Sequence, residues 1–128
     1  MSDKTITITN FEMEHYISIL SDFLDRADII GYAAARNTRL LTEASLDHMR
    51  IKNELLRKYG SVVKDVDGNE TNEIAITDND EHFDDVKTQL DISGNTKHHV
   101  NLFMISYDDV INKLTGYEIL SIDWMIEH

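Results

Sequence analysis

The stretch from Asp28 to Gly60 contains no proline, and its only glycines are Gly31 and Gly60. A helix of roughly 30 residues is about 45 Å long, which exceeds the diameter of a small domain. We therefore expect one long helix against which the rest of the chain packs, ending at Gly60 because glycine adopts the left-handed conformation that follows a helix. The apolar residues of the stretch recur at the spacing of one helix face, and they are Ile30, Ala34, Leu41, Ala44, Ile51, Leu55 and Tyr59.

The residues before this helix predict a strand and a further helix. Lys4 to Thr9 alternates β-branched residues, as a strand does, and Thr9 and Glu12 have the spacing of a capping box. The helix that follows is expected to reach about Asp25. Its connection to the long helix is so short that the two should form a long antiparallel hairpin over residues 10–60. The residues expected to be buried on the first helix are Tyr16, Ile19, Leu20, Phe23 and Leu24.

The chain after Gly60 predicts a small β-sheet and short helices. Two β-prone runs flank an Asp-Gly turn, which favours a β-hairpin, and capping signals predict two C-terminal helices, the first of them ending near Leu114. The sequence therefore predicts a mostly helical α+β protein with a single domain over residues 1–128, whose second part, residues 61–128, is acidic. The further elements expected are hairpin strands over Val62–Val66 and Glu73–Thr77, a helix over Glu81–Leu90 and a buried strand over His99–Ile105.

Charge is distributed unevenly along the chain, whose net charge is −12. Residues 36–58 hold six basic and three acidic side chains, whereas residues 65–91 hold ten acids and one lysine. Either both surfaces are simply solvated, or the acidic one binds a basic partner, such as a nucleic-acid-handling or defence protein. Direct DNA binding is not expected, because phosphate contacts need Lys and Arg. The acids assigned to a partner-binding surface are Asp78, Asp80, Glu81, Asp84 and Asp85.

The sequence predicts no catalytic, metal or cofactor site. The chain has no cysteine, which excludes disulfides and thiolate metal ligands. His98 and His99 are adjacent in a predicted strand and so point to opposite faces, and no serine lies in a glycine-rich elbow. The N-terminal residues do not resemble a signal peptide, and no apolar run has the roughly 20 residues needed to cross a bilayer. We expect a non-enzymatic, cytoplasmic protein.

Polar residues of the predicted long helix are the candidates for ligand binding. Tyr32, Arg36 and Arg39 share one face at i, i+4 and i+7, so the tyrosine can stack on a base while the arginines hold a phosphate. The alternative is a solvated face on which Arg39 pairs with the glutamate one turn further on. Asn37 and His48 fall on the apolar face and are interpreted as hydrogen-bonded core residues, although Asn37 also belongs to the candidate ligand site.

Four short motifs carry a family resemblance. They are YAAARN with the following LL (Tyr32 to Leu41), ELLRKYG (Glu54 to Gly60), DVDGNE (Asp65 to Glu70) and the closing GYEILSIDWMIEH. In this order they resemble a family of small uncharacterised proteins from phages and prophages of Gram-positive bacteria. The resemblance implies a phage origin and the cytoplasm of a host cell, and it assigns no catalytic residue.

Three functions remain open from the sequence. The first is a stoichiometric inhibitor of a host enzyme or anti-phage defence system that presents the acidic surface to its partner. The second is a binder, or sponge, of a small nucleotide signal at Tyr32, Arg36 and Arg39. The third is a phage assembly or virion-associated protein that forms a homo-oligomer through the helical hairpin. The first is preferred, because small acidic phage proteins without enzyme motifs most often act by binding.

Overall fold

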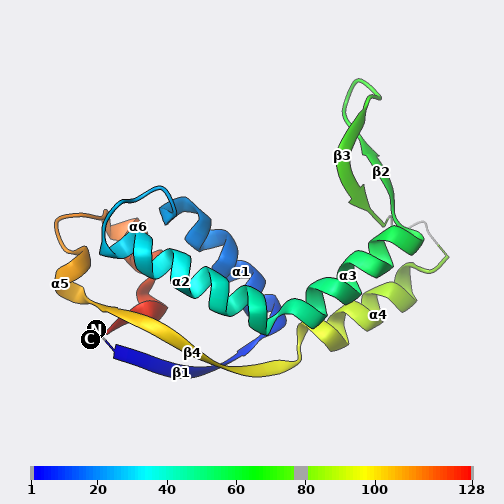
Figure 1. The fold of residues 1–128 in the computed structure, drawn as a ribbon. Coiled ribbons are helices and arrows are strands. Elements are labelled where there is room, and N and C mark those ends of the chain that lie inside the picture. Colours follow the sequence, from blue (N-terminus) through cyan, green and yellow to red (C-terminus); the bar gives the residue numbers. More distant parts are fainter. Residues whose placement is uncertain (1, 77–80, 128) are drawn as a thin grey trace. The chain divides into compact units, whose positions relative to one another are not determined.

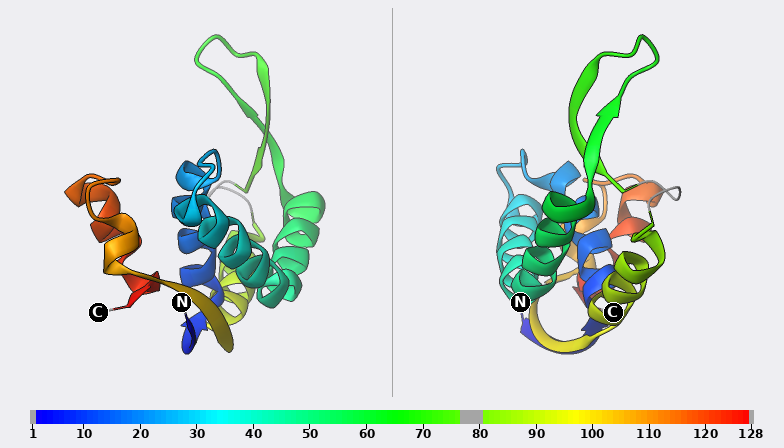
Figure 2. Two further views of the ribbon diagram at one scale, coloured as in Figure 1. Left: turned by 60° about the vertical axis from the view of Figure 1, so that its left-hand side comes forward. Right: turned by 90° about the vertical axis from the view of Figure 1, so that its right-hand side faces the viewer.

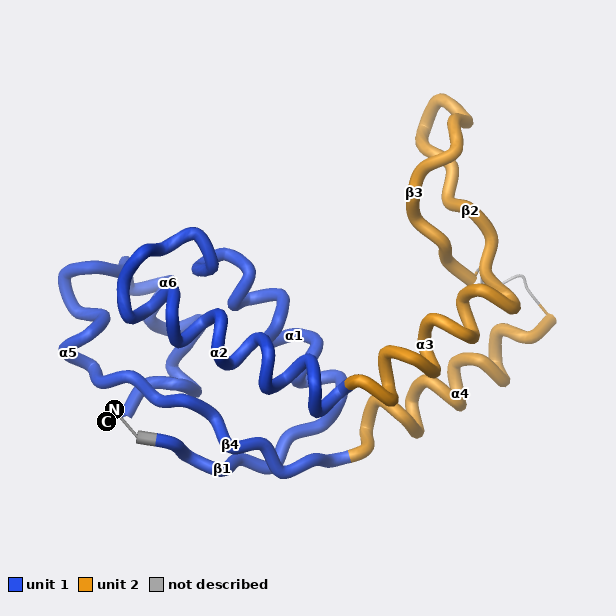
Figure 3. Tube along the Cα trace, in the orientation of Figure 1, with its two compact units in different colours: residues 1–45, 97–128 blue, residues 46–96 orange. Residues whose placement is uncertain are grey.

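The chain divides into two units, which are described one at a time (Figure 3). Unit 1 comprises residues 1–45 and 97–128, and unit 2 comprises residues 46–96. The structure is a computed structural model that describes residues 2–76 and 81–127. Its elements have the α+β composition that the sequence predicts, with helices in the majority. Unit 2 is inserted into the sequence of unit 1.

The sheet of unit 1 pairs two strands that are far apart in the sequence. β1 (Ser2–Thr9) lies antiparallel to β4 (Lys97–Ser106), with Ile6 opposite Val100, and the short β5 (Ile126–Glu127) adds in parallel at the end of β4. One face is apolar and packs into the core. The other is polar over the first half of β4, where the Thr7 hydroxyl lies 3.0 Å from His99 Nδ1, but it is covered at Phe103 and Ile105. The alternation of a sheet with one covered face therefore holds only as far as Leu102, and both predicted strands are confirmed.

Two helices of unit 1 pack against each other and against this sheet (Figure 1). α1 (Asn10–Leu20) begins with the predicted capping box, since the Thr9 hydroxyl accepts from the Glu12 N–H and the Glu12 carboxylate accepts from the Thr9 N–H. It ends earlier than predicted, because a 3₁₀ turn (Ser21–Phe23) follows it and leaves Leu24 exposed. Leu20 and Phe23 are buried as expected.

The N-terminus of α2 (Ile29–Ala44) is held by an ion pair and a close backbone contact. Asp28 caps the helix by accepting from the Gly31 N–H at 3.2 Å, and Arg26 Nη2 donates to its carboxylate at 2.6 Å. The hydrogen bond from Arg26 is the main cause that lowers the pKa of Asp28 below its usual value. Gly31 lies so close to Arg26 that an added Cβ would stand 1.9 Å from the Arg26 carbonyl oxygen.

Asn37 joins α2 to the edge of β4 that faces away from β1. Its Nδ2 donates to the Phe103 carbonyl oxygen at 2.8 Å, and its Oδ1 accepts from the Phe103 N–H at 2.8 Å. Because β5 pairs only with Ile105 and Ser106, these two backbone groups of Phe103 have no strand partner on that edge in residues 2–76 and 81–127. The fully buried amide thus replaces a missing strand, and the interpretation of Asn37 as a hydrogen-bonded core residue is confirmed.

The predicted long helix from Asp28 to Gly60 is wrong, because two helices occupy the stretch. α2 ends at Ala44, and α3 (Leu46–Tyr59) begins after a single non-helical residue, Ser45. The buried Ser45 hydroxyl donates back to the Leu41 carbonyl oxygen at 2.8 Å, and its own N–H donates to the same oxygen at 3.0 Å. Ser45 leaves the helical conformation (φ −97°, ψ 10°), and its hydroxyl satisfies a carbonyl oxygen of the last turn of α2. The long antiparallel hairpin over residues 10–60 is therefore not confirmed, and within unit 1 the helices that pack as antiparallel neighbours are α1 and α2.

The C-terminal part of unit 1 contains two short capped helices. α5 (Tyr107–Val110) and α6 (Gly116–Ser121) both begin with the predicted capping boxes. In the first, Asp109 accepts from the Ser106 N–H and hydroxyl at 2.9 Å, which lowers the pKa of its carboxyl. α5 ends well before the predicted Leu114, because Ile111 is extended and Asn112 has a φ of 65°. A 3₁₀ turn (Asp123–Met125) then places the Trp124 ring in a stack with Tyr16, at 4.0 Å.

Unit 2 is built on the pair of helices α3 and α4 (Phe83–Gly94). His48 of α3 is buried, and its Nδ1 lies 2.7 Å from the Ser93 hydroxyl of α4, so the prediction of a hydrogen-bonded core histidine is confirmed. At the other end of the pair, the Tyr59 and His82 rings are 4.6 Å apart. These two contacts fix α4 along α3.

A β-hairpin follows α3 and projects from its end (Figures 1 and 2). β2 (Ser61–Lys64) and β3 (Glu70–Ala75) pair around the predicted Asp-Gly turn, where Gly68 has a φ of 82°. Gly60 is not in the left-handed conformation that we predicted. It is required for a different reason, since an added Cβ would lie 2.3 Å from the Leu56 carbonyl oxygen and 2.5 Å from Ile74 Cγ2. Glycine therefore lets β3 approach the end of α3.

Candidate functional site

Arg36 is the best-organised of the candidate ligand-binding residues. Its guanidinium carbon lies 5.0 Å from the centre of the Phe103 ring, within cation–π distance. Its Nη1 donates to the Tyr32 hydroxyl at 3.3 Å, and the Tyr32 ring meets Phe103 edge-on at 5.4 Å. Two rings from different elements, α2 and β4, thus hold the arginine in place.

Arg39 extends this cluster by one turn of α2. Tyr32, Ala35, Arg36 and Arg39 line a groove of about 340 Å³, which we call the α2 groove. The alternative pairing of Arg39 with Glu43 does not form, and no carboxylate in residues 2–76 and 81–127 pairs with either arginine. The guanidinium donors that face the groove are therefore not neutralised by the described chain. The structure brings together three of the four predicted ligand-site residues.

Asn37, the fourth of those residues, lies outside the groove. Its side chain is fully buried, and both its donor and its acceptor are used by the Phe103 backbone. A surface ligand could bind this amide only by breaking those two bonds, which would leave buried backbone groups without partners. Asn37 therefore supports the strand that carries Phe103 and contacts no ligand in the groove.

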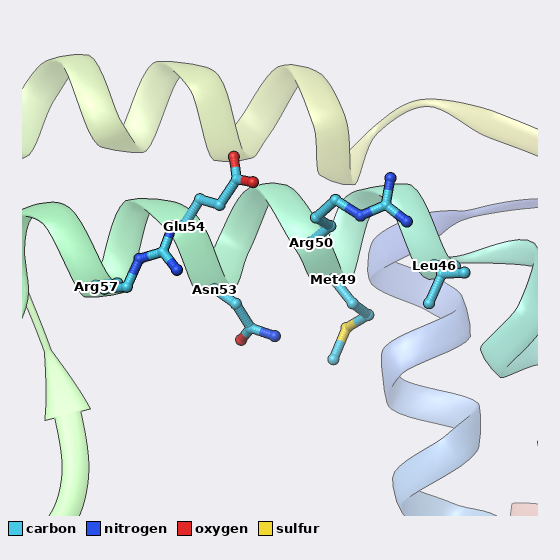
Figure 4. A pocket seen from close by; sticks show the side chains of 6 residues that line it. All are labelled: Leu46, Met49, Arg50, Asn53, Glu54 and Arg57. Carbon is cyan, nitrogen blue, oxygen red and sulfur yellow. The ribbon is translucent and has the colours of Figure 1, made fainter.

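A second groove, of about 410 Å³, lies along α3 in unit 2 (Figure 4). Its charges are mixed, because the Arg50 Nη1 pairs with Asp47 at 3.5 Å and Glu54 contributes a carboxylate. No aromatic side chain lines it, so it lacks the platform that the α2 groove has. Figure 4 shows Met49 and Asn53 pointing to the same side of the helix. The residues that line it are Leu46, Met49, Arg50, Asn53, Glu54 and Arg57.

The predicted acidic surface is described only in part. Asp78 and Asp80 lie outside the described residues. Glu81, Asp84 and Asp85 are exposed around the start of α4, and the Glu81 carboxylate lies 3.3 Å from His82 Nε2. Asp84 and Asp85 occupy the first turn of the helix, where a negative charge is also favourable for the helix itself.

The hairpin of unit 2 adds acids and apolar surface that were not assigned to this site from the sequence. Asp65 orders its turn, since Oδ1 accepts from the Asp67 and Asn69 N–H groups at 2.9 Å each. Val66 stands at this turn with a relative exposure of 103%. Val62 and Ile74, which pair across the strands, are about half exposed. The hairpin thus presents aliphatic side chains between carboxylates.

Sequence reasoning missed two residues that matter for these sites. Phe103 was expected only as part of a buried strand, and its proximity to Arg36 depends on a contact between α2 and β4 that no local pattern encodes. Val66 was placed in a strand, although the aspartates on both sides of it and the glycine that follows favour a turn. Both residues are apolar, and neither carries a functional motif.

Among residues 2–76 and 81–127, no three His, Asp or Glu side chains gather closely enough to hold a metal ion. Over the same described ranges, every helix is too short or too polar to cross a bilayer.

Comparison with known proteins assigns no family to the chain. It matches no protein-family model, no curated protein and no solved structure. The resemblance to phage proteins therefore stays a prediction.

Proposed function

We propose that the chain is a non-enzymatic interaction protein that binds a basic surface of a partner protein. The binding surface is the acidic end of unit 2, which we define as the hairpin from Ser61 to Ala75 together with Glu81, Asp84 and Asp85. If the resemblance to phage proteins holds, the partner is a host protein, such as a nucleic-acid-handling or defence enzyme, and binding inhibits it stoichiometrically.

The observation that carries this proposal is the ordered turn that exposes Val66. An aliphatic side chain in full contact with water is unfavourable for the chain alone, by roughly 25 cal/mol for each Å² that a partner could cover. The turn is nevertheless well organised, because Asp65 uses its carboxylate to accept two N–H groups of it. An ordered apolar tip is typical of a residue that anchors an interface.

The charges beside this tip define the kind of partner. The exposed acids of the hairpin are Asp65, Asp67, Glu70 and Glu73, and Lys64 is its one basic residue. The contact between Tyr59 and His82 brings the start of α4 to the end of α3 from which the hairpin projects. Acids from both elements therefore gather at one end of unit 2, and they attract a positively charged surface.

The strands of the hairpin also have free edges. β2 and β3 pair only with each other in the described chain, so each leaves one row of backbone N–H and C=O groups without a strand neighbour. A two-stranded hairpin is marginally stable by itself. A partner that covers its apolar side chains, or adds a strand to one edge, would stabilise it.

Capture from an extract of a Gram-positive bacterium tests the proposal. The tagged chain is expected to retain a basic protein at about 0.05 M salt and to release it at about 0.5 M, because screening weakens exposed charge pairs. The double variant Asp84→Asn/Asp85→Asn should retain clearly less. Asp22→Asn/Asp25→Asn is the matched control, since it removes two exposed acids from unit 1. Equal loss with both double variants would contradict a localised acidic site.

A further inference from the structure

We propose that the α2 groove, in unit 1, is a binding site for a nucleotide, with the base stacked on Tyr32 and the phosphate held by Arg36 and Arg39. This site is separate from the acidic end of unit 2 in both residues and chemistry. It concerns an anionic small molecule, whereas the acidic end concerns a basic protein.

Arg36 is oriented before any ligand arrives. Phe103 lies under its guanidinium at 5.0 Å, and the Tyr32 hydroxyl accepts one of its five N–H groups at 3.3 Å. The remaining donors have no carboxylate partner among the described residues. An arginine whose plane is already fixed loses less side-chain entropy when it binds a phosphate. Phe103 is thus a positioning residue for Arg36.

Arg39 supplies a second cation at the distance that a phosphate needs. Residues three apart on a helix have Cβ atoms roughly 5–6 Å from each other, so both guanidinium groups can reach oxygens of one phosphate. The chain has a net charge of −12 and holds 24 acids. The two arginines form a small positive site on an acidic protein, because none of the described acids neutralises either of them. Such a site favours an anion in a charge-selective manner.

Tyr32 supplies the platform for the base. Its relative exposure is 54%, and its edge-on contact with Phe103 at 81° holds the ring while leaving much of its surface open. A base that stacks on a tyrosine is recognised by its π-face, so the four bases should differ little. The groove therefore selects ligands that combine a base with a phosphate, and it does not select one particular base.

The size of the groove suits a single nucleotide. Its volume of about 340 Å³ is at the lower end for small-molecule sites, which span roughly 300–1,000 Å³. Ala35 keeps the groove open, because it lines the groove with only a methyl group. A larger residue at this exposed position would fill the groove without removing a charge.

The test measures binding of AMP, adenosine and inorganic phosphate to the full chain by isothermal titration calorimetry at low salt. AMP is expected to saturate one site and to bind at least roughly tenfold more tightly than either adenosine or phosphate, since it alone makes both contacts. GMP and UMP should bind within a few-fold of AMP. Failure of all three nucleotides to saturate at millimolar concentration overturns the proposal.

Three variants locate the binding. Ala35→Leu and Arg39→Gln should each weaken AMP binding by roughly tenfold or more. Both positions are exposed, and both substitutions suit a helix, so folding should be preserved. Arg57→Gln removes an exposed arginine from α3 and is the matched control. If Arg57→Gln weakens AMP binding as much as Arg39→Gln does, the attraction is general and the assigned site is wrong.

The outcomes also separate this site from the proposed function. Arg39→Gln and Ala35→Leu should leave capture of the protein partner unchanged, and Asp84→Asn/Asp85→Asn should not weaken AMP binding. AMP binding that persists in the Ala35→Leu variant overturns the placement of the ligand in the groove, whatever the capture experiment shows.

Discussion

Replacement of Asn37 by alanine tests how α2 supports β4. The substitution removes the amide that donates to the Phe103 carbonyl oxygen and accepts from the Phe103 N–H, both at 2.8 Å. Phe103 has a relative exposure of only 8%, so water does not readily replace the lost partners. Both backbone groups then lack a partner among the described residues, because β5 reaches only Ile105 and Ser106 on that edge.

The expected cost is large relative to the stability of a small protein. Each buried group that loses its partner costs about 1–3 kcal/mol, so the pair costs about 2–6 kcal/mol. Typical domains are stable by about 5–15 kcal/mol, and Asn37→Ala should therefore bring unit 1 close to unfolding at room temperature. The cavity left by the smaller side chain adds to this loss.

Urea denaturation, followed by circular dichroism and by Trp124 fluorescence, measures the effect. Trp124 belongs to unit 1, where its ring stacks on Tyr16, so its signal reports on the unit that contains Asn37. Thr42→Ala is the matched control, because Thr42 is an exposed position on the same helix, and a change within about 0.5 kcal/mol is expected. If Asn37→Ala unfolds at the same urea concentration as Thr42→Ala, the amide does not replace a strand.

Two further predictions concern the start of α2. Gly31→Ala should destabilise the protein by about 1–3 kcal/mol or more, because the added Cβ would stand 1.9 Å from the Arg26 carbonyl oxygen; Gly116→Ala, where nothing lies within 4 Å of the added Cβ, is the control and should cost little in a thermal melt. The lowered pKa of Asp28 means that its folded form binds a proton less readily than its unfolded form, so its contribution to stability is present above the ordinary carboxyl pKa of 3.8 and is lost as the pH falls below it. Asp28→Asn should therefore melt at a lower temperature than the parent chain at pH 7, and the difference between the two melting temperatures should shrink as the pH approaches 3. A difference that stays constant over this range would refute the ion-pair explanation.

Local features of the fold could be predicted because their causes are local. The capping boxes at Thr9, Ser106 and Thr115 depend on residues three apart, and the hairpin turn depends on Gly68 and its neighbours. The break at Ser45 could not be predicted, because positions with helical spacing stay buried on both sides of it. Those positions are Asn37, Leu41, His48 and Leu55.

The candidate sites show the same division. The spacing of Tyr32, Arg36 and Arg39 follows from the helix alone, and α2 retains it. Phe103 and the buried role of Asn37 depend on the packing of α2 against β4, which joins residues 66 positions apart. The helix end at Gly60 was predicted correctly but for the wrong reason, since the need for glycine there depends on Leu56 and on Ile74 of the following hairpin.

The measurement that tests the proposed function most directly is recovery of the partner by the Val66→Ser variant. The substitution leaves every charge of the acidic end in place and removes only the apolar contact of the exposed tip. The parent chain and the control Asp22→Asn/Asp25→Asn should recover similar amounts of the partner. Val66→Ser should recover roughly tenfold less or lower still, since a buried aliphatic anchor contributes about 1.5–3 kcal/mol. Undiminished recovery with Val66→Ser would contradict the claim that this hairpin forms the interface.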